Sequence, residues 1–184
     1  MIDRLPDRLV WIDCEMTGLD LGRDELVEIA CVVTDGALTE LDDGVDVVIL
    51  PSDGALATMP DVVREMHTVS GLLEDIPNGV PLADAEMMVL DYVRRHIPDA
   101  GKAPLAGSSV YVDRGFIARD MPALDQHLHY RVVDVSSVKE LVRRWYPSAI
   151  HGRPFKIGTQ MSNILDAMQA KKQELAKAEK IRKQ

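Results

Sequence analysis

Apolar residues in the first fifty positions come in short runs bounded by turn residues. Runs of this kind, rich in β-branched side chains, are typical of strands in a buried sheet. The predicted strands are residues 9–14, 26–35 and 45–50. An Asp-Asp-Gly turn signal at 42–44 lies between the second and the third strand. The chain is therefore predicted to open with a β-meander.

Beyond residue 50 the apolar positions follow helical spacing. A short helix is predicted over residues 60–72, beginning at Pro60 and Asp61 and ending near Gly71. Residues 81–97 carry apolar side chains at positions 87, 90, 93 and 97, and these steps of three and four indicate an amphipathic helix. This change of period marks the end of the meander.

Two more strands are predicted to alternate with helices in the second half of the chain. Residues 103–110 form the first of them, and a helix is expected to begin at Asp113. Residues 131–137 form the second, with Ser136 or Ser137 as the N-cap of the helix that follows. A last helix is expected from about residue 160, where one stripe of side chains is apolar.

This order of elements predicts a single α/β domain over residues 1–184. A meander followed by alternating helices and strands is typical of a mixed sheet, here of five strands, with helices on both faces. A chain of 184 residues is long enough for one sizeable core and fits one domain.

Charge is unevenly distributed along the chain. The net charge is −9, and residues 171–184 hold six Lys or Arg against two Glu, so the other residues carry 15 basic and 28 acidic side chains. Proteins bind long nucleic acid largely through Lys and Arg contacts with phosphates. The acidic body therefore argues against long duplex nucleic acid as a partner and favours a metal site or short substrates.

Cys14 and Cys31 fall in apolar, strand-like runs and are expected to be buried free thiols in a reducing cytoplasm. No apolar run approaches the roughly 20 residues of a membrane helix. The first residues also lack the basic and apolar segments of a secretory signal. We therefore expect a soluble, cytoplasmic protein without a membrane partner.

The first strand carries two carboxylates, Asp13 and Glu15, two positions apart. Such residues point to the same face of a strand, so the two side chains project side by side. Close carboxylates repel each other, and a hard divalent cation with oxygen ligands would remove the repulsion. The plainer alternative is that one acid is exposed at the strand end and the other pairs with an arginine.

Two further acids extend this pattern. Asp113 directly follows a predicted strand, and Asp166 lies on the last predicted helix among apolar residues. Taken singly, Asp113 also fits a helix N-cap, and Asp166 a solvated helix face. Four acids from scattered segments, two of them on one strand, fit a site in which two divalent metal ions catalyse phosphoryl transfer.

Three stretches resemble the oligoribonuclease family, in its actinobacterial version, within the DEDD superfamily of 3′→5′ exonucleases. They are WIDCEMTGLD (11–20), APLAGSSVYVDRGFIARDMP (103–122) and LHYRVVDVSSVKELVRRWYP (128–147), and the likeness is nearly gap-free over residues 8–147. The resemblance implies a ribonuclease H-like exonuclease fold and a homodimer. It also implies an enzyme that degrades very short RNA, chiefly dinucleotides, to nucleoside monophosphates with two Mg²⁺ or Mn²⁺ ions.

The resemblance further assigns roles to single residues. The implied metal ligands are Asp13, Glu15, Asp113 and Asp166. Leu19 would wedge against the bases of a dinucleotide, and His67 and Ser109 would line the nucleotide pocket. Without the resemblance, Leu19 reads as ordinary core and His67 as a histidine on a helix surface.

A cap over the terminal phosphate, supplied by the partner subunit, is implied for Tyr130, Arg131, Ser136 and Ser137. Arginine and hydroxyl donors form charge-assisted hydrogen bonds with phosphate, and a closed end limits the length of the substrate. Without the resemblance, Tyr130 and Arg131 read as an amphipathic pair at the start of a strand.

The likeness breaks down in the divergent C-terminal segment, residues 148–184, which holds the family's third motif. The family has its general base, a histidine, five residues before the last metal-binding aspartate. Here Met161 stands at that distance from Asp166, and its thioether cannot exchange a proton near pH 7. The base is therefore unassigned, and Tyr130 and His151 are the remaining candidates.

Three functions follow from these observations. The first is the metal-dependent exoribonuclease on very short RNA. The second is a catalytically impaired homolog that binds short RNA without efficient turnover. The third is an exonuclease on DNA ends, which the acidic composition disfavours.

Overall fold

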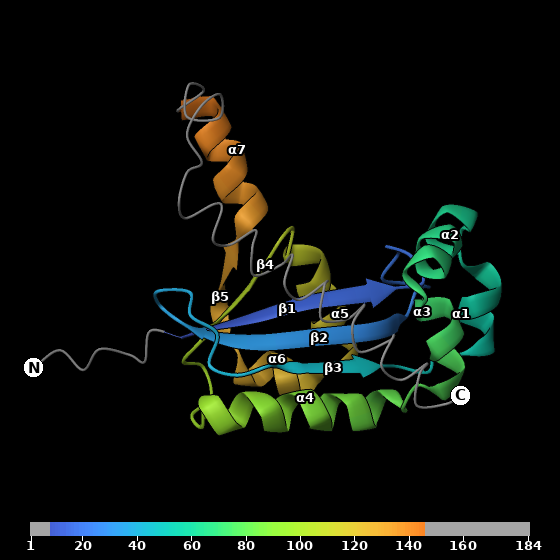
Figure 1. The fold of residues 1–184 in the computed structure, drawn as a ribbon, viewed down its shortest axis with the longest axis horizontal. Helices are drawn as coiled ribbons and strands as arrows, with labels where there is room; N and C mark the ends of the chain where they lie inside the picture. Colours follow the sequence, from blue (N-terminus) through green and yellow to red (C-terminus); the bar gives the residue numbers. More distant parts are fainter. Residues whose placement is uncertain (1–7, 146–184) are drawn as a thin grey trace, which may run out of the picture.

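The computed structural model describes residues 8–145, which form a mixed five-stranded sheet with helices packed against it (Figure 1). The strands are β1 (Arg8–Met16), β2 (Leu26–Asp35), β3 (Val45–Val48), β4 (Pro104–Gly107) and β5 (His129–Asp134). Their order across the sheet is β3-β2-β1-β4-β5. The β1–β2 and β2–β3 pairs are antiparallel, whereas β1–β4 and β4–β5 are parallel. The predicted meander and mixed sheet are confirmed.

The helices follow the strands in the order that the sequence pattern predicts, with several short additions. They are α1 (Asp53–Thr58), α2 (Asp61–Ser70), α3 (Leu72–Asp75), the 3-10 helix η1 (Ile76–Asn78), α4 (Leu82–His96), α5 (Tyr111–Asp120), α6 (Pro122–His127) and α7 (Val135–Trp145). The predicted end of α2 is confirmed, because Gly71 follows it in the left-handed conformation with φ of 87°.

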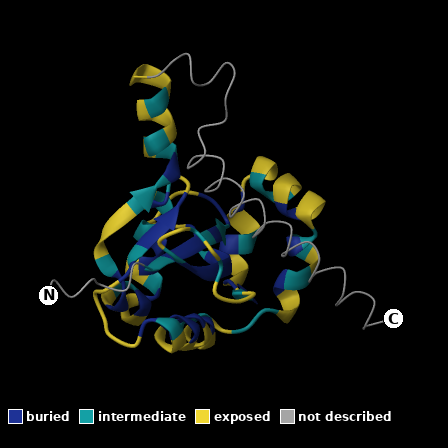
Figure 2. Cartoon of the chain, turned by 60° about the vertical axis from the view of Figure 1, so that its left-hand side comes forward, coloured by how far each residue is buried: buried dark blue, intermediate teal, exposed yellow. Residues whose placement is uncertain are grey.

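The main core lies on one face of the sheet. Val10, Ile12 and Cys14 alternate along β1 and belong to the same buried cluster as apolar residues of α4, α5 and α6. On the opposite face, Trp11 is fully buried beside Val135 at the start of α7. Figure 2 shows the buried strands and an α7 that stands away from the body with much of its surface exposed.

The same opposite face is covered at its other end by α3 and η1. A bulge between Glu15 and Met16 shifts the register of β1 against β2, and Val27 of β2 packs there with Leu72 and Ile76. Helices therefore lie on both faces, as predicted. The second face of β1 is flanked by α7 at one end and by the α2–η1 segment at the other.

Several boundaries differ from the predictions. The strand predicted over 103–110 is shorter, and α5 begins at Tyr111 rather than at Asp113. The strand predicted over 131–137 is β5, which begins and ends earlier. α7 begins at Val135, so the predicted caps Ser136 and Ser137 lie inside its first turn. The carboxylate of Asp134, the residue before the helix, accepts the N–H of Ser136 instead.

Cys14 and Cys31 are buried and form no disulfide, as predicted. Burial is the main cause that raises the pKa of the Cys31 thiol far above its ordinary value. In the part of the chain that the structure describes, no helix has the length and apolar character that crossing a membrane requires.

Candidate active site

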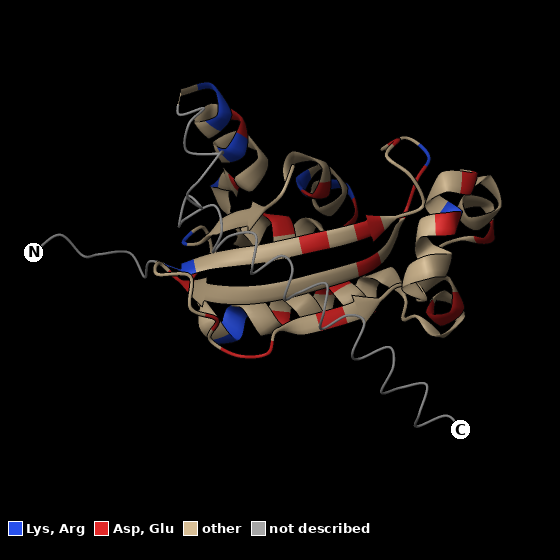
Figure 3. Cartoon of the chain, turned by 45° about the horizontal axis from the view of Figure 1, so that its top comes forward, with Lys and Arg blue, Asp and Glu red and all other residues tan. Residues whose placement is uncertain are grey.

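Asp13 and Glu15 lie near the end of β1 and, two residues apart, share one face of the sheet. In the β1–β2 register, Asp13 is opposite Ala30 and Glu15 is opposite Glu28. Glu28 is buried, and sequence reasoning passed over it although it interrupts an apolar strand. Figure 3 shows these acidic bands on the two neighbouring strands. This end of the sheet is therefore rich in carboxylate oxygens.

Asp113 joins the carboxylates of β1 from the first turn of α5. Its Oδ1 accepts the backbone N–H of Cys14, the residue between Asp13 and Glu15, at 2.9 Å. The N-cap interpretation is wrong, because Asp113 lies inside α5 and its side chain accepts a hydrogen bond from β1. Burial raises the pKa of Asp113 to about 7, and the nearby Asp13 adds to the rise, while the Cys14 N–H opposes it.

Carboxylate oxygens are the ligands that Mg²⁺ and Mn²⁺ prefer, so the donor chemistry of these three acids fits the metals that the sequence implies. Within residues 8–145, no three His, Cys, Asp or Glu side chains are arranged so that they could already hold an ion. The fourth implied ligand, Asp166, lies outside the described residues, as do Met161 and His151.

His67 connects α2 with the end of β1. Its side chain is buried, and its Nε2 lies 2.9 Å from the carbonyl oxygen of Met16, to which the ring N–H donates. The interpretation of His67 as a surface histidine is therefore wrong. The contact fixes the imidazole ring one residue beyond Glu15, beside the acidic end of the strand.

Residues 17–25 connect β1 with β2 and carry Leu19. The side chain of Leu19 is 73% exposed, so its interpretation as ordinary core is wrong. The segment folds around Asp24, whose buried carboxylate accepts the N–H of Asp20 at 2.9 Å and pairs with Arg23 at 3.2 Å. The hydrogen bond from Arg23 is the largest of the causes that lower the pKa of Asp24.

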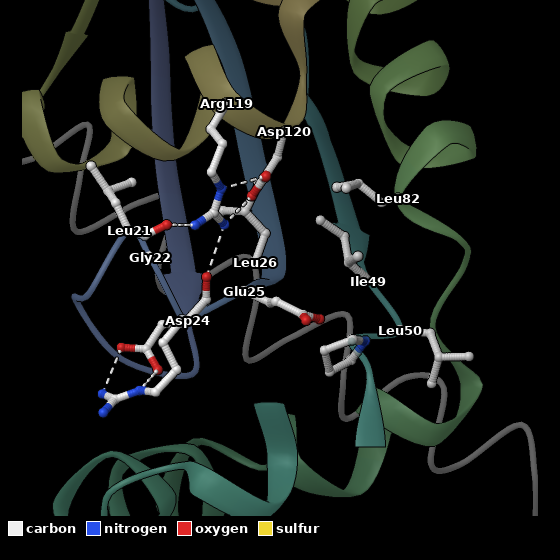
Figure 4. Close-up of a pocket in the computed structure, with 12 residues that line it drawn as sticks. Leu21, Gly22, Asp24, Glu25, Leu26, Ile49, Leu50, Leu82, Arg119 and Asp120 are labelled. Atoms are coloured by element: carbon white, nitrogen blue, oxygen red, sulfur yellow. Dashed lines mark hydrogen bonds and ion pairs between the residues drawn. The ribbon is translucent and has the colours of Figure 1, made fainter. Parts of the chain in front are cut away.

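Arg119 holds this segment from the far end of α5. Its guanidinium donates to the carbonyl oxygens of Leu21 and of Asp24, the latter at 2.8 Å, and pairs with Asp120 at 2.6 Å (Figure 4). The helix that carries Asp113 therefore also anchors the segment that presents Leu19.

A cavity of about 490 Å³ lies beside this anchor, between segment 17–25 and the chain that leads from β3 into α1 (Figure 4). The charged side chains that line it have partners within the chain. Glu25, for example, accepts the N–H and the hydroxyl of Ser52, each at 2.7 Å. These charges hold the segment in place, and the carboxylates of β1 do not line the cavity.

Ser109 and Ser136 come together in one chain. Their hydroxyl oxygens are 3.0 Å apart, and the Ser136 hydroxyl is also 2.9 Å from that of Ser108. The resemblance assigns Ser109 to the nucleotide pocket of its own subunit and Ser136 to the cap of the partner's pocket. Within a subunit, the two assignments therefore meet in a single hydroxyl cluster where β4 and β5 end.

Tyr130 and Arg131 lie at the start of β5, the edge strand of the sheet, and both are exposed. The guanidinium carbon of Arg131 lies 5.4 Å from the centre of the Tyr130 ring, a cation–π contact. His129 precedes Tyr130 in the sequence, and the centres of their two rings are 4.4 Å apart. These side chains are open to a partner.

The comparisons with known proteins agree with this geometry. Residues 10–173 match the family model described as Exonuclease (RNase_T). An Oligoribonuclease of Streptomyces avermitilis is 63% identical over 152 residues, which cover 83% of this chain and 76% of that protein. The Oligoribonuclease of Rhodococcus jostii is 61% identical, and the match covers 83% of this chain and 77% of that protein. That of Mycobacterium avium is 62% identical, over 82% of this chain and 70% of that protein.

Among solved structures, a product-bound exonuclease I superposes with a TM-score of 0.58 at 16% identity, over 77% of this chain. The match covers 33% of that chain, so this protein corresponds to about a third of exonuclease I. A likeness at this identity shows the fold, which is the ribonuclease H-like exonuclease fold. Together with relatives that are about 60% identical over most of both sequences, it places the protein: the chain belongs to the oligoribonuclease family of exonucleases.

Proposed function

We propose that the protein is a 3′→5′ exoribonuclease that hydrolyses very short RNA, chiefly dinucleotides, to nucleoside monophosphates. The observation that carries this proposal is the hydrogen bond from the Cys14 N–H to Asp113, which brings the third carboxylate to Asp13 and Glu15. A set of carboxylates at one strand end, in a chain of this family, suits metal-assisted cleavage of a phosphodiester.

The proposed cofactors are two Mg²⁺ or Mn²⁺ ions, held by Asp13, Glu15, Asp113 and, on the resemblance, Asp166. When bound, such ions activate water and stabilise the leaving oxygen. The described residues supply the positions: β1 fixes two carboxylates on one face, and α5 presents the third to the backbone of the same strand.

Recognition of the substrate is proposed to use Leu19, His67 and Ser109. The exposed Leu19 is free to stack on a base, and the hydrogen bond to Met16 orients the His67 ring towards the end of β1. The overall negative charge, −9, suits substrates with few phosphates. We propose no role for long duplex nucleic acid.

The functional unit is proposed to be a homodimer in which each subunit caps the terminal phosphate bound by the other. Exposed Tyr130 and Arg131 on the edge strand, together with Ser136 and Ser137, would form the cap. The cytoplasm is the proposed location, because two buried cysteines without a disulfide suit a reducing compartment.

The test is hydrolysis of a 5′-phosphorylated RNA dinucleotide with Mn²⁺, followed as release of mononucleotides. Asp13→Ala is expected to abolish both hydrolysis and Mn²⁺ binding by calorimetry, while the circular dichroism stays unchanged. Asp91→Ala, which removes an exposed carboxylate of α4, is the matched control and should leave both intact. Unchanged Mn²⁺ affinity in Asp13→Ala would contradict the proposed site.

The same assay separates the catalytically impaired homolog from the enzyme. Turnover near the typical enzyme rate of about 10 s⁻¹ would mean that the protein has a general base despite Met161. Binding of the dinucleotide with hydrolysis at least about 100-fold slower would favour the impaired homolog, because a positioned base contributes about that factor or more. The match to the Exonuclease family continues to residue 173, so the segment that contains Met161 and Asp166 belongs to the matched region.

A further inference from the structure

Asp134, the last residue of β5, collects hydrogen bonds from two separate segments. Its Oδ1 accepts the backbone N–H of Ser136 at 2.8 Å and that of Ser109 at 3.0 Å. Its Oδ2 accepts the hydroxyl of Ser137 at 3.3 Å. Asp134 pairs with Gly107 across the parallel β4–β5 ladder, so one carboxylate connects the ends of both strands.

The backbone of Ser109 needs such a connection. Its φ is 55°, in the left-handed region, which costs a residue with a side chain about 1–2 kcal/mol. A strained conformation persists where neighbouring groups enforce it. Here the Asp134 carboxylate holds the Ser109 N–H, and the Ser136 hydroxyl lies 3.0 Å from the Ser109 hydroxyl.

We infer that Asp134 is a positioning residue for the phosphate cap: by holding the backbone N–H groups of Ser136 and of the adjacent Ser109, it fixes the Ser136 hydroxyl so that this hydroxyl can donate to the 5′-phosphate of a short RNA. The inference deepens the proposed function and rests on it. Asp134 itself would repel a phosphate, but it accepts three hydrogen bonds within the chain and so acts through the serines. The Ser137 hydroxyl donates to Asp134, so of the two cap serines Ser136 is the proposed phosphate donor, together with Arg131.

The test compares two dinucleotides that differ only at the 5′ end, one with a phosphate and one with a hydroxyl. Affinities are measured at equilibrium with Ca²⁺ in place of Mg²⁺. The wild type is expected to prefer the phosphorylated form. Asp134→Ala removes the acceptor of all three hydrogen bonds and should reduce this preference about tenfold, the effect of one hydrogen bond to a charged group. A merely structural role would weaken both dinucleotides alike and leave the preference unchanged.

Two variants sharpen the comparison. Ser136→Ala should reduce the preference as much as Asp134→Ala, and the double variant should lose no more than either single one, because both act on one group. Asp35→Ala is the matched control: Asp35 Oδ1 also accepts two backbone N–H groups, from Ala37 and Thr39, but at the turn after β2. It should leave the preference unchanged.

An unchanged preference in folded Asp134→Ala, an equal loss for both dinucleotides, or additive losses in the double variant would overturn the inference. Should Asp134→Ala fail to fold, it is introduced into a Ser109→Gly background and compared with Ser109→Gly alone, since glycine adopts the left-handed conformation without strain. A wild type that prefers the phosphorylated dinucleotide but does not hydrolyse it contradicts the proposed function, not the role of Asp134. A wild type without a preference overturns that role.

Discussion

The carboxyl group of Asp113 has two tasks at the scale of a single residue. It accepts the Cys14 N–H, and it is the acid that the proposed metals would share with β1. Burial, with a smaller effect of Asp13, raises its pKa to about 7. The folded protein therefore binds this proton more tightly than the unfolded chain does. The resulting stability is fully present below the ordinary pKa of 3.8 and is lost as the pH rises through 7.

Asp113→Asn tests this predicted loss of stability as the pH rises. Asparagine keeps the acceptor for the Cys14 N–H but cannot ionise, so the metal-free variant should be more stable than the metal-free wild type at pH 8, by up to a few kcal/mol at about 1.4 kcal/mol per unit of pKa. The difference should shrink towards pH 5. Thermal unfolding across this pH range measures it. A difference that does not change with pH would contradict the role of burial, and added Mn²⁺ should stabilise the wild type alone.

At the scale of an element, the segment of residues 17–25 is held from two sides. Asp24 anchors it from within, and Arg119 of α5 anchors it from outside. Gly18 is packed against the inner anchor: a Cβ at this position would lie 2.3 Å from Asp24 Oδ2. The exposed Leu19 follows directly, so its placement depends on this contact.

Gly18→Ala is therefore expected to displace the Asp24 carboxylate and to lower the free energy of unfolding by about 1–3 kcal/mol, as overpacking does. The affinity for a dinucleotide should fall as well. Gly54→Ala in α1 is the control, because its Cβ would meet only the Ser52 hydroxyl at 3.8 Å. That variant should be neutral or more stable by about 0.5–1 kcal/mol. Normal stability and binding in Gly18→Ala would mean that the segment tolerates a shift of its anchor.

For the molecule as a whole, α7 is an element that stands away from the body and exposes apolar side chains (Figure 2). Its apolar side chains recur at steps of three and four, and two of them, Leu141 and Trp145, are 42% and 66% exposed. Tyr130 and Val132 on the neighbouring edge strand are exposed too. An apolar surface of this kind is typical of a protein–protein interface and supports the proposed dimer.

Leu141→Glu should convert the dimer into monomers in light scattering, because a charge would be buried in the interface. Lys139→Gln changes the net charge by the same amount on the charged face of α7 and should remain dimeric. Hydrolysis of the 5′-phosphorylated dinucleotide should fall when the dimer is lost, since the proposed cap would come from the partner. A dimeric Leu141→Glu variant would place the interface elsewhere.

Elements with a regular hydrophobic pattern could be predicted from the sequence. The opening strands and α4 have such a pattern, and the shared face of Asp13 and Glu15 follows from the geometry of a strand. The short helices α1 and α6 were missed, because six residues hold too few turns for a periodic signal. β5 begins at His129, two residues before the predicted start, because the exposed Tyr130 of this edge strand interrupts the apolar pattern.

The environment of single side chains was harder to predict. In α2 the apolar residues Val62, Met66 and Val69 are exposed, while His67 is the buried residue, because a carbonyl of β1 accepts its N–H. Glu28 is buried in β2, and Asp134 connects two segments that are 25 residues apart. Each depends on contacts between distant segments, which composition and spacing do not contain.

The hydrogen bond between the Cys14 N–H of β1 and Asp113 of α5 offers a way to observe the site in solution. β1 pairs with β4 at Val10 and Trp11, and further along the same strand the N–H of Cys14 is held by the Asp113 carboxylate. Deuterium uptake at this one amide should therefore report whether α5 is docked on the sheet. A single backbone position can follow the assembly of the site in solution, with no nucleotide or metal added.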